Sequence, residues 1–405
     1  PGNPIISIRA FSENAAEVSA HVKAFLEGAQ AEGRKDTRHR VLVTVKHFPG
    51  HGDTVSDSHL GLGKVEAALE RLRAVELPPF QAAIDAKVDS IMTAHLWVPA
   101  IEPEEIPATV SAKVLTGLLR KEMRFTGIIT TDAMDMQGLS RQFSHGEAAV
   151  RSLEAGADVL LMPPDPAAAV SGVARAVQSG RLSLQRVEES VQKILRAKVR
   201  LGLHKSRVVD LESVSDSLEL EEDEELAQRV ATRAVALVRN EGGVLPLAKP
   251  ETSCWYLLTE NRLGQQGRAL AEFLTDRSPK AKRILLDPQV SRTVMESSVD
   301  ANCSVHIAAA FAGFSGKGVL SANYAALVEA LAAGGKPVVL VGLGNPYLLR
   351  GYEKVQAFLA TFSTVPASEI AAAKAILGDI AVSGKMPVTI PGLAPYGSGL
   401  ETARK

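Results

Sequence analysis

Short apolar segments alternate with helical segments through the first half of this chain, and this order most strongly limits the folds open to it. The segments are apolar at successive positions rather than at every second one, which is typical of strands buried on both faces of a parallel sheet. They cover residues 41–47, 90–95, 127–132 and 158–162. Helical spacing of apolar residues predicts helices over 13–33, 65–87, 111–123, 147–155, 166–178 and 183–200, and the second is expected to break near Pro78-Pro79. The pattern predicts an α/β fold with a helix-covered parallel sheet.

Polar side chains stand at the carboxyl ends of three of these predicted strands: Lys46 and His47, His95, and Asp132. The carboxyl ends of parallel strands lie at one edge of a sheet, so these side chains should converge there. A (β/α)8 barrel and an open doubly wound sheet both place their ligand sites at this edge. The pattern predicts a site and leaves both architectures open.

The first predicted strand runs into the segment Lys46-His-Phe-Pro-Gly-His-Gly-Asp-Thr54. Pro49, Gly50 and Gly52 exclude a continuing strand or a regular helix, so this segment is a loop. With Asp57-Ser-His59 just beyond it, the region holds three of the chain's nine histidines. That clustering favours a shaped site over a polar surface turn.

A metal site is one interpretation of this loop. His47 and His51 have the spacing H-x3-H, and Asp53, Asp57 and His59 would supply further donor atoms. This spacing places two imidazoles on one face only within a helix, and the intervening Pro-Gly pair prevents a helix. No metal is therefore predicted.

Acid/base chemistry is the other interpretation. Asp57 would orient and charge His59, while Lys46 and His47 would bind a polar substrate. At these residues the chain resembles the bacterial β-N-acetylglucosaminidases of glycoside hydrolase family 3, of the two-domain type. In that family an Asp-His pair lies on a mobile loop, and its His is the general acid/base. The resemblance assigns these roles to Asp57 and His59, and sugar-hydroxyl contacts to Lys46 and His47.

A second segment, Thr130-Thr-Asp-Ala-Met134, resembles the catalytic segment of the same family, and Asp132 aligns with its nucleophile. Retaining glycoside hydrolysis needs a carboxylate that attacks the anomeric carbon and forms a covalent glycosyl-enzyme. Asp135 is the rival, but it belongs to the following loop, and a helix N-cap is the structural alternative for Asp132. Arg9 aligns with an arginine of the family that contacts substrate. His95 is interpreted either as a substrate contact or as a core histidine.

The pattern changes after residue 204, and the family resemblance extends over nearly the whole chain. Residues 1–204 are expected to form a catalytic (β/α)8 TIM-type barrel, 205–240 a linker and a connecting helix reaching about Arg239, and 241–405 a second α/β sandwich domain. A barrel of this type takes about 250 residues and eight strands, so we expect its first units to precede Pro1. Strands of the second domain are predicted at 255–258, 283–286, 306–310, 337–342 and 357–361.

Composition excludes several other classes of protein. The net charge of −1 provides no strong field for nucleic acid or an anionic membrane, and no apolar run approaches the length of a membrane span. Cys254 and Cys303 are the only cysteines; two buried thiols are expected, with a single bridge as the alternative. Nothing in the sequence indicates the compartment or the oligomeric state.

Together these residues predict a retaining exo-β-N-acetylglucosaminidase that needs no metal or organic cofactor. Asp132 would attack C1, and His59 would protonate the leaving oxygen and then deprotonate water. The substrate would be a small carbohydrate with terminal β-linked N-acetylglucosamine, from the cell wall or from chitin, and the resemblance favours cell-wall muropeptides. One alternative is a phosphorylase, because a neutral imidazole does not repel phosphate as a carboxylate base would. The other is a non-catalytic carbohydrate-binding protein.

Overall fold

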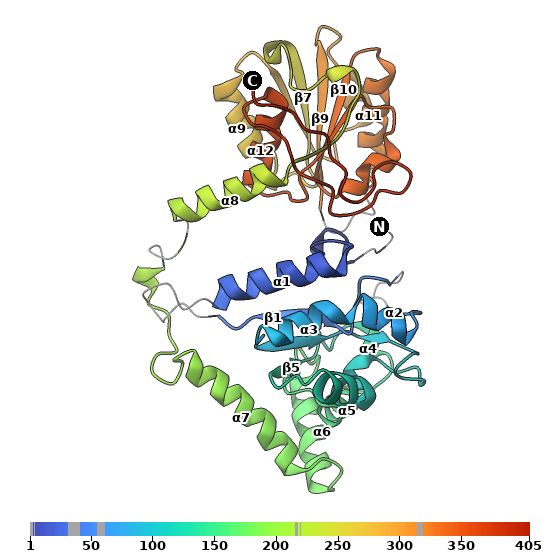
Figure 1. Cartoon of the computed structure of the whole chain (residues 1–405), viewed down its shortest axis with the longest axis vertical. Helices are drawn as coiled ribbons and strands as arrows, with labels where there is room; N and C mark the ends of the chain where they lie inside the picture. Colours follow the sequence, from blue (N-terminus) through green and yellow to red (C-terminus); the bar gives the residue numbers. More distant parts are fainter. Residues whose placement is uncertain are drawn as a thin grey trace. The chain divides into compact units, whose positions relative to one another are not determined.

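The computed structural model describes residues 3, 5–30, 41–54, 61–214, 218, 220–313 and 319–405. The chain divides into two compact units (Figure 1). The N-terminal unit is Ala10–Asp210, and the C-terminal unit combines Leu211–Lys405 with Pro1–Arg9. In the described part of the chain, no helix is long and apolar enough to cross a membrane.

A parallel sheet with the strand order β1-β3-β5 lies at the centre of the N-terminal unit. Its strands are β1 (Thr44–Phe48), β3 (Ser90–Thr93) and β5 (Ile128–Thr130). Val45 pairs with Ile91, and Ile91 with Ile129, so all three strands end at the same edge. The short strands β2 (Gly63–Lys64) and β4 (Leu96–Trp97) form a separate parallel pair. The predicted parallel sheet is confirmed, and its carboxyl edge carries the predicted polar residues.

Residues 158–162, expected as a fourth strand, pair with β5 only through a bridge between Thr130 and Val159. The pairing ends early because Met162 has a φ of +47° and is followed by Pro163 and Pro164, which lack a backbone N–H. The prediction of a full strand here is wrong. Among the described residues, the strand pairing of this sheet stops at that bridge.

Helices cover this sheet, and most fall where apolar spacing predicted them. The expected break in the helix over 65–87 is confirmed: the chain turns at Val75 and Glu76, and the Pro78-Pro79 pair lies in the first turn of the second helix. Phe48, Phe80 and Leu115 belong to the main core of the unit. The helices are α1 (Ala15–Gln30), α2 (Leu69–Ala74), α3 (Leu77–Asp85), the 3-10 helix η3 (Ala108–Val110), the π-helix η4 (Lys113–Glu122), α4 (Gln137–Ser140), α5 (His145–Ala155), α6 (Pro166–Gln178) and α7 (Leu184–Arg200).

The C-terminal unit is built on a six-stranded sheet with the order β6-β11-β10-β9-β7-β8. All five predicted strands are present. The connecting helix was expected to reach Arg239, but it ends at Ala234, and the next residues form a strand that pairs antiparallel with β11. No local pattern of residues 236–240 indicates that they pair with β11, so the sequence alone did not predict this strand. The strands are β6 (Ala236–Asn240), β7 (Ser253–Leu258), β8 (Lys282–Leu286), β9 (Val305–Ala312), β10 (Val338–Gly344) and β11 (Ala357–Ala360).

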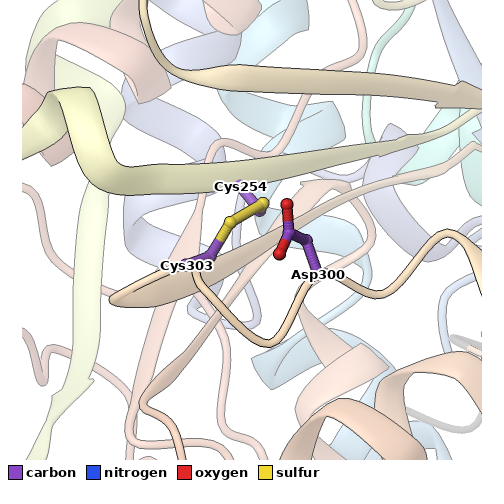
Figure 2. Close-up of side chains that lie close together, drawn as sticks. All are labelled: Cys254, Asp300 and Cys303. Atoms are coloured by element: carbon purple, nitrogen blue, oxygen red, sulfur yellow. A yellow bond between two sulfur atoms is a disulfide. The ribbon is translucent and has the colours of Figure 1, made fainter.

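The two cysteines are bonded to each other as a buried disulfide (Figure 2). Cys254 is the second residue of β7, and Cys303 lies just before β9. Because Ser253 pairs with Val305 in the sheet, the two cysteine Cα atoms are 5.8 Å apart, which is within bridging range. The expectation of two free thiols is therefore wrong.

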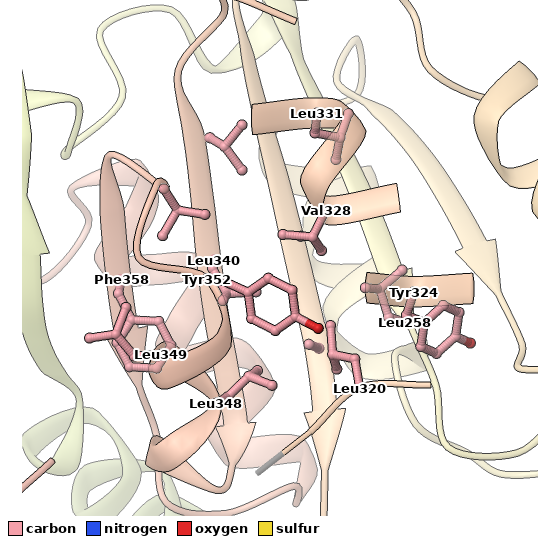
Figure 3. Close-up of a cluster of buried hydrophobic side chains, with 14 of the residues drawn as sticks. Leu258, Leu320, Tyr324, Val328, Leu331, Leu340, Leu348, Leu349, Tyr352 and Phe358 are labelled. Atoms are coloured by element: carbon pink, nitrogen blue, oxygen red, sulfur yellow. The ribbon is translucent and has the colours of Figure 1, made fainter. Parts of the chain in front are cut away.

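Successive residues of β7 point into two different cores. Cys254, Tyr256 and Leu258 belong to one core, and Trp255 and Leu257 to the other. The first core packs against α11 (Figure 3), and the second packs against α9 and α12 on the opposite face (Figure 1). This arrangement confirms the layered α/β domain. The helices are α8 (Glu221–Ala234), α9 (Arg268–Arg277), α10 (Arg292–Ser297), α11 (Ala322–Ala333) and α12 (Pro366–Leu377), with the 3-10 helices η1 (Ser7–Arg9), η5 (Leu211–Ser213), η7 (Glu241–Gly243), η8 (Pro250–Thr252) and η9 (Pro346–Gly351).

Candidate active site

The side chains of His47 and Asp132 approach each other at the carboxyl edge of the N-terminal sheet, with His47 Nε2 3.7 Å from Asp132 Oδ2. His47 is in β1 and Asp132 follows β5, and β3 lies between these strands. Strands on either side of a third are about 10 Å apart, so the two side chains meet across the end of β3. His47 is buried, and the Asp132 side chain is 17% exposed.

A bulge in β1 changes the direction of the side chains next to His47. Val45 pairs with Ile91 and Phe48 with Thr93, so β1 has one more residue than β3 between these two pairs. Bulges of this kind re-aim side chains and are frequent beside active sites. The bulge therefore falls at the position from which His47 reaches Asp132.

The loop after β1 is fixed by close packing. The carboxylate-bearing side chain of Glu76 crosses it at Gly50, where a Cβ atom would lie 2.7 Å from Glu76 Cγ and where φ is +141°. His51 is buried, with its Nδ1 2.7 Å from the hydroxyl of Thr54. Its ring lies edge-on to that of His47, with centroids 5.9 Å apart. The predicted loop begins at Pro49 rather than at Lys46, because β1 continues to Phe48. From the sequence, His51 was a candidate only as a metal ligand. Its four-residue spacing from His47 was the one signal that these two side chains lie close together.

Residues 159–161 hold the segment that carries Asp132. The carboxylate Oδ1 of Asp132 accepts a hydrogen bond from the N–H of Ala133 at 2.8 Å. Thr131 is fully buried; its N–H donates to the carbonyl of Val159 at 3.0 Å, and its hydroxyl oxygen accepts from the N–H of Leu161 at 2.9 Å. The residues expected as a fourth strand thus serve to fix the segment around Asp132.

His95 lies on the other side of this segment, in the protein interior. Its side chain is 0% exposed, its Nε2 is 3.0 Å from the carbonyl oxygen of Ala133, and its Nδ1 is 2.8 Å from Thr109 Oγ1. The full burial of His95 favours the core interpretation of this residue over a contact with substrate.

The other predicted site residues lie in varied positions. Lys46 and Asp135 are exposed, and Asp135 offers its backbone carbonyl to the hydroxyl of Ser140. Arg9 ends η1, which groups with the C-terminal unit rather than with the sheet that carries Asp132. Asp57 and His59, the predicted acid/base pair, lie outside the described residues.

A buried ionic cluster underlies β5. Asp158 accepts hydrogen bonds from the N–H of Ile129, from Arg120 and from Lys193, at 3.0, 2.5 and 3.1 Å. Burial by itself raises the pKa of Asp158, but the charge of Arg120 and the hydrogen bonds outweigh it and hold this pKa below its ordinary value. Burial also lowers the pKa of Arg120 and that of Lys193. The positive charge of Arg186 lowers both of these pKa values further, whereas the Asp158 carboxylate raises them and offsets part of the effect of burial.

One group of potential metal ligands is present among the described residues: Cys254, Asp300 and Cys303, whose ligand atoms lie within 4.8 Å of one another. Figure 2 shows that the carboxylate of Asp300 lies beside the bonded sulfur atoms. Thiolate is the form of cysteine that binds metal. The disulfide therefore removes two of the three donors.

The fold and the site define a two-domain α/β protein whose candidate catalytic carboxylate lies at the carboxyl edge of a parallel sheet. Residues 1–197 match the glycosyl hydrolase family 3 N terminal domain, and residues 291–397 match its C-terminal domain. The solved structure of a glycoside hydrolase family 3 β-N-acetylglucosaminidase from Paenibacillus sp. str. FPU-7 matches 96% of this chain and 74% of its own, with a TM-score of 0.85 and 33% identity. The chain belongs to glycoside hydrolase family 3.

Two curated relatives are similar over different shares of the chain. Beta-hexosaminidase A from Pseudoalteromonas piscicida is 33% identical in an alignment of 271 residues that covers 61% of this chain and 43% of that protein. The beta-N-acetylglucosaminidase/beta-glucosidase of Cellulomonas fimi is 26% identical over 414 residues, covering 95% of this chain and 71% of that protein. The chain thus spans less than half the length of the first relative.

Proposed function

We propose that this chain acts as a retaining exo-β-N-acetylglucosaminidase. The observation that carries the proposal is the approach of the Asp132 carboxylate to His47, 3.7 Å apart at the carboxyl edge of the sheet, while Asp135 is exposed. The names of the similar proteins, β-N-acetylglucosaminidase and beta-hexosaminidase, support this choice of sugar. The substrate would be an oligosaccharide with terminal β-linked N-acetylglucosamine.

In the proposed mechanism, an Asp132 oxygen attacks C1 of the sugar, and the bond from C1 to the leaving oxygen breaks. His59, oriented by Asp57, gives its proton to that oxygen, and later takes a proton from the water that attacks the glycosyl ester. The ring nitrogen of His47 and the ammonium of Lys46 would donate hydrogen bonds to sugar hydroxyls. The N–H of Ala133 holds one Asp132 oxygen and leaves the other, Oδ2, facing His47.

The substitution Asp132→Asn tests the proposal, because a neutral amide cannot form the ester. Turnover of a nitrophenyl β-N-acetylglucosaminide should disappear while the fold persists. Asp135→Asn is the matched control and should keep most of the activity. Mass spectrometry of a slow substrate should find the sugar on the peptide that contains Asp132; a label on Asp135 would refute the assignment.

The same assay separates the remaining possibilities. A rate that rises with added phosphate, with a sugar phosphate as product, would indicate a phosphorylase. Sugar binding without turnover would indicate a carbohydrate-binding protein, and a loss of activity with chelator would indicate a metal. Competition between a muropeptide and a chitooligosaccharide compares the two candidate substrates directly.

A further inference from the structure

Ala133, the residue after the proposed nucleophile, is held at both ends. Its N–H donates to Asp132 Oδ1 at 2.8 Å, and its carbonyl oxygen lies 3.0 Å from His95 Nε2. A carbonyl oxygen only accepts hydrogen bonds, so Nε2 carries the proton and donates it. The N–H of Met136 donates to the same carbonyl at 3.2 Å, so His95 and Met136 together fix the residue whose N–H points at the carboxylate of the nucleophile.

The ring of His95 is itself held in one orientation. Its Nδ1 lies 2.8 Å from Thr109 Oγ1, which lies 2.7 Å from Thr93 Oγ1. All three side chains are 0% exposed, so bulk water does not compete for these hydrogen bonds. Turning the ring would take its two buried nitrogens away from Thr109 and Ala133, which is unfavourable. The imidazole is thus a rigid support for Ala133.

We propose that His95 is a positioning residue for the covalent step, acting on Asp132 through Ala133. The inference rests on the proposed role of Asp132 as nucleophile. Attack on C1 requires the carboxylate oxygen in line with the departing oxygen, and a misplacement of about 1 Å can slow such a step about 100-fold. Because none of its surface is exposed, His95 supports the nucleophile without touching the sugar. Losing its hydrogen bond should therefore impair catalysis more than sugar binding.

Two substitutions distinguish the loss of this hydrogen bond from a general loss of stability. His95→Met fills the site without a donor, whereas His95→Gln keeps an N–H close to the position of Nε2. With a nitrophenyl β-N-acetylglucosaminide and the full chain, His95→Met should lower kcat/KM about 10- to 100-fold. The Ki for N-acetylglucosamine should stay close to that of the wild type, and His95→Gln should recover most of the lost kcat/KM. A purely structural role would lower Tm in both variants and leave kcat/KM of the folded fraction unchanged.

His306→Met is the matched control, because His306 is a buried histidine of the C-terminal unit with its Nδ1 3.3 Å from the Tyr256 hydroxyl. It should lower Tm and leave kcat/KM unchanged. Thr109→Val removes the hydroxyl partner of His95 and should lower kcat/KM in the same direction, which tests the inference even if His95→Met does not fold.

Three results would count against the inference. A folded His95→Met variant with wild-type kcat/KM would overturn this inference but not the proposed function. Equal kcat/KM losses in His95→Met and His95→Gln at the same Tm would also overturn it, as would a Thr109→Val variant with wild-type kcat/KM. An inactive wild-type chain would overturn the proposed function and, with it, this inference.

Discussion

Replacing Asp158 by Asn should destabilise the N-terminal unit strongly. The Asp158 side chain is 0% exposed and lies 2.5 Å from Arg120 Nη2, 3.1 Å from Lys193 Nζ and 3.5 Å from Arg186 Nη1. Its lowered pKa shows that these attractions exceed the cost of burying the charge. Asparagine keeps the size of the side chain but leaves the cations without their counter-charge.

The size of the effect follows from the burial of the cluster. Breaking a buried ion pair by removing one partner costs about 3–5 kcal/mol. Asparagine can still accept a hydrogen bond from the N–H of Ile129, so we expect the lower part of this range. For a unit of this size, a loss of about 3 kcal/mol lowers Tm by roughly 6–12 °C. The matched control is Glu66→Gln, because Glu66 pairs with Lys64 at 2.8 Å but is mostly exposed; this variant should melt close to the wild type.

The pH dependence of stability gives an independent test. The folded pKa of Asp158 is below its unfolded value, so its contribution is complete above the unfolded pKa, which is about 3.9. The contribution is lost as the pH falls through the folded pKa. Calorimetric scans should therefore show a large difference in Tm between wild type and Asp158→Asn at pH 7 and pH 5, and a smaller one below about pH 4. Equal Tm values for Asp158→Asn and Glu66→Gln at pH 7, or a difference that persists unchanged at pH 3, would refute this reasoning.

Three further predictions concern the loop, the acid and the disulfide. Gly50→Ala should cost about 1–3 kcal/mol, because its Cβ would overlap Glu76 at a strained φ; it should also reduce kcat/KM, and a variant with wild-type Tm would contradict it. His59→Ala should slow poor leaving groups far more than acidic phenols, which need little protonation; equal losses would make His59 a binding residue. Removing the Cys254–Cys303 bond, which closes a loop of 49 residues, should cost about 4 kcal/mol by loop entropy. Thermal unfolding of the double alanine variant, and of wild type in reductant, should give matching losses, and two titratable thiols in unreduced unfolded protein would show that the bond does not form.

The order of helices and strands along the chain could largely be predicted from the sequence. Strands buried on both faces require unbroken apolar runs, and those runs located β3, β5 and all five parallel strands of the C-terminal unit. The same runs ended at His47 and Asp132, because polar side chains are disfavoured in the buried part of a sheet and tolerated at its carboxyl edge. Local spacing also located α6 and α7 to within a residue.

Features that depend on pairing between distant segments were not readable. The local pattern of β6 predicts the end of a helix, and only its pairing with β11 makes it a strand. The run at 158–162 reads as a strand, although prolines end its pairing at once. The disulfide likewise depends on the neighbouring positions of β7 and β9, since thiols 49 residues apart in sequence carry no local sign of contact.

At the site, the sequence by itself determined which residue types stand at the carboxyl edge of the sheet, because strand periodicity and the Pro-Gly loop are local properties of the chain. Only the tertiary structure decided how they are used. It brings His47 to Asp132 across the end of β3, leaves Asp135 exposed, and turns His95 inward onto Ala133. These outcomes depend on the register of three strands and on a bulge in one of them, and register is set by packing between segments far apart in the sequence.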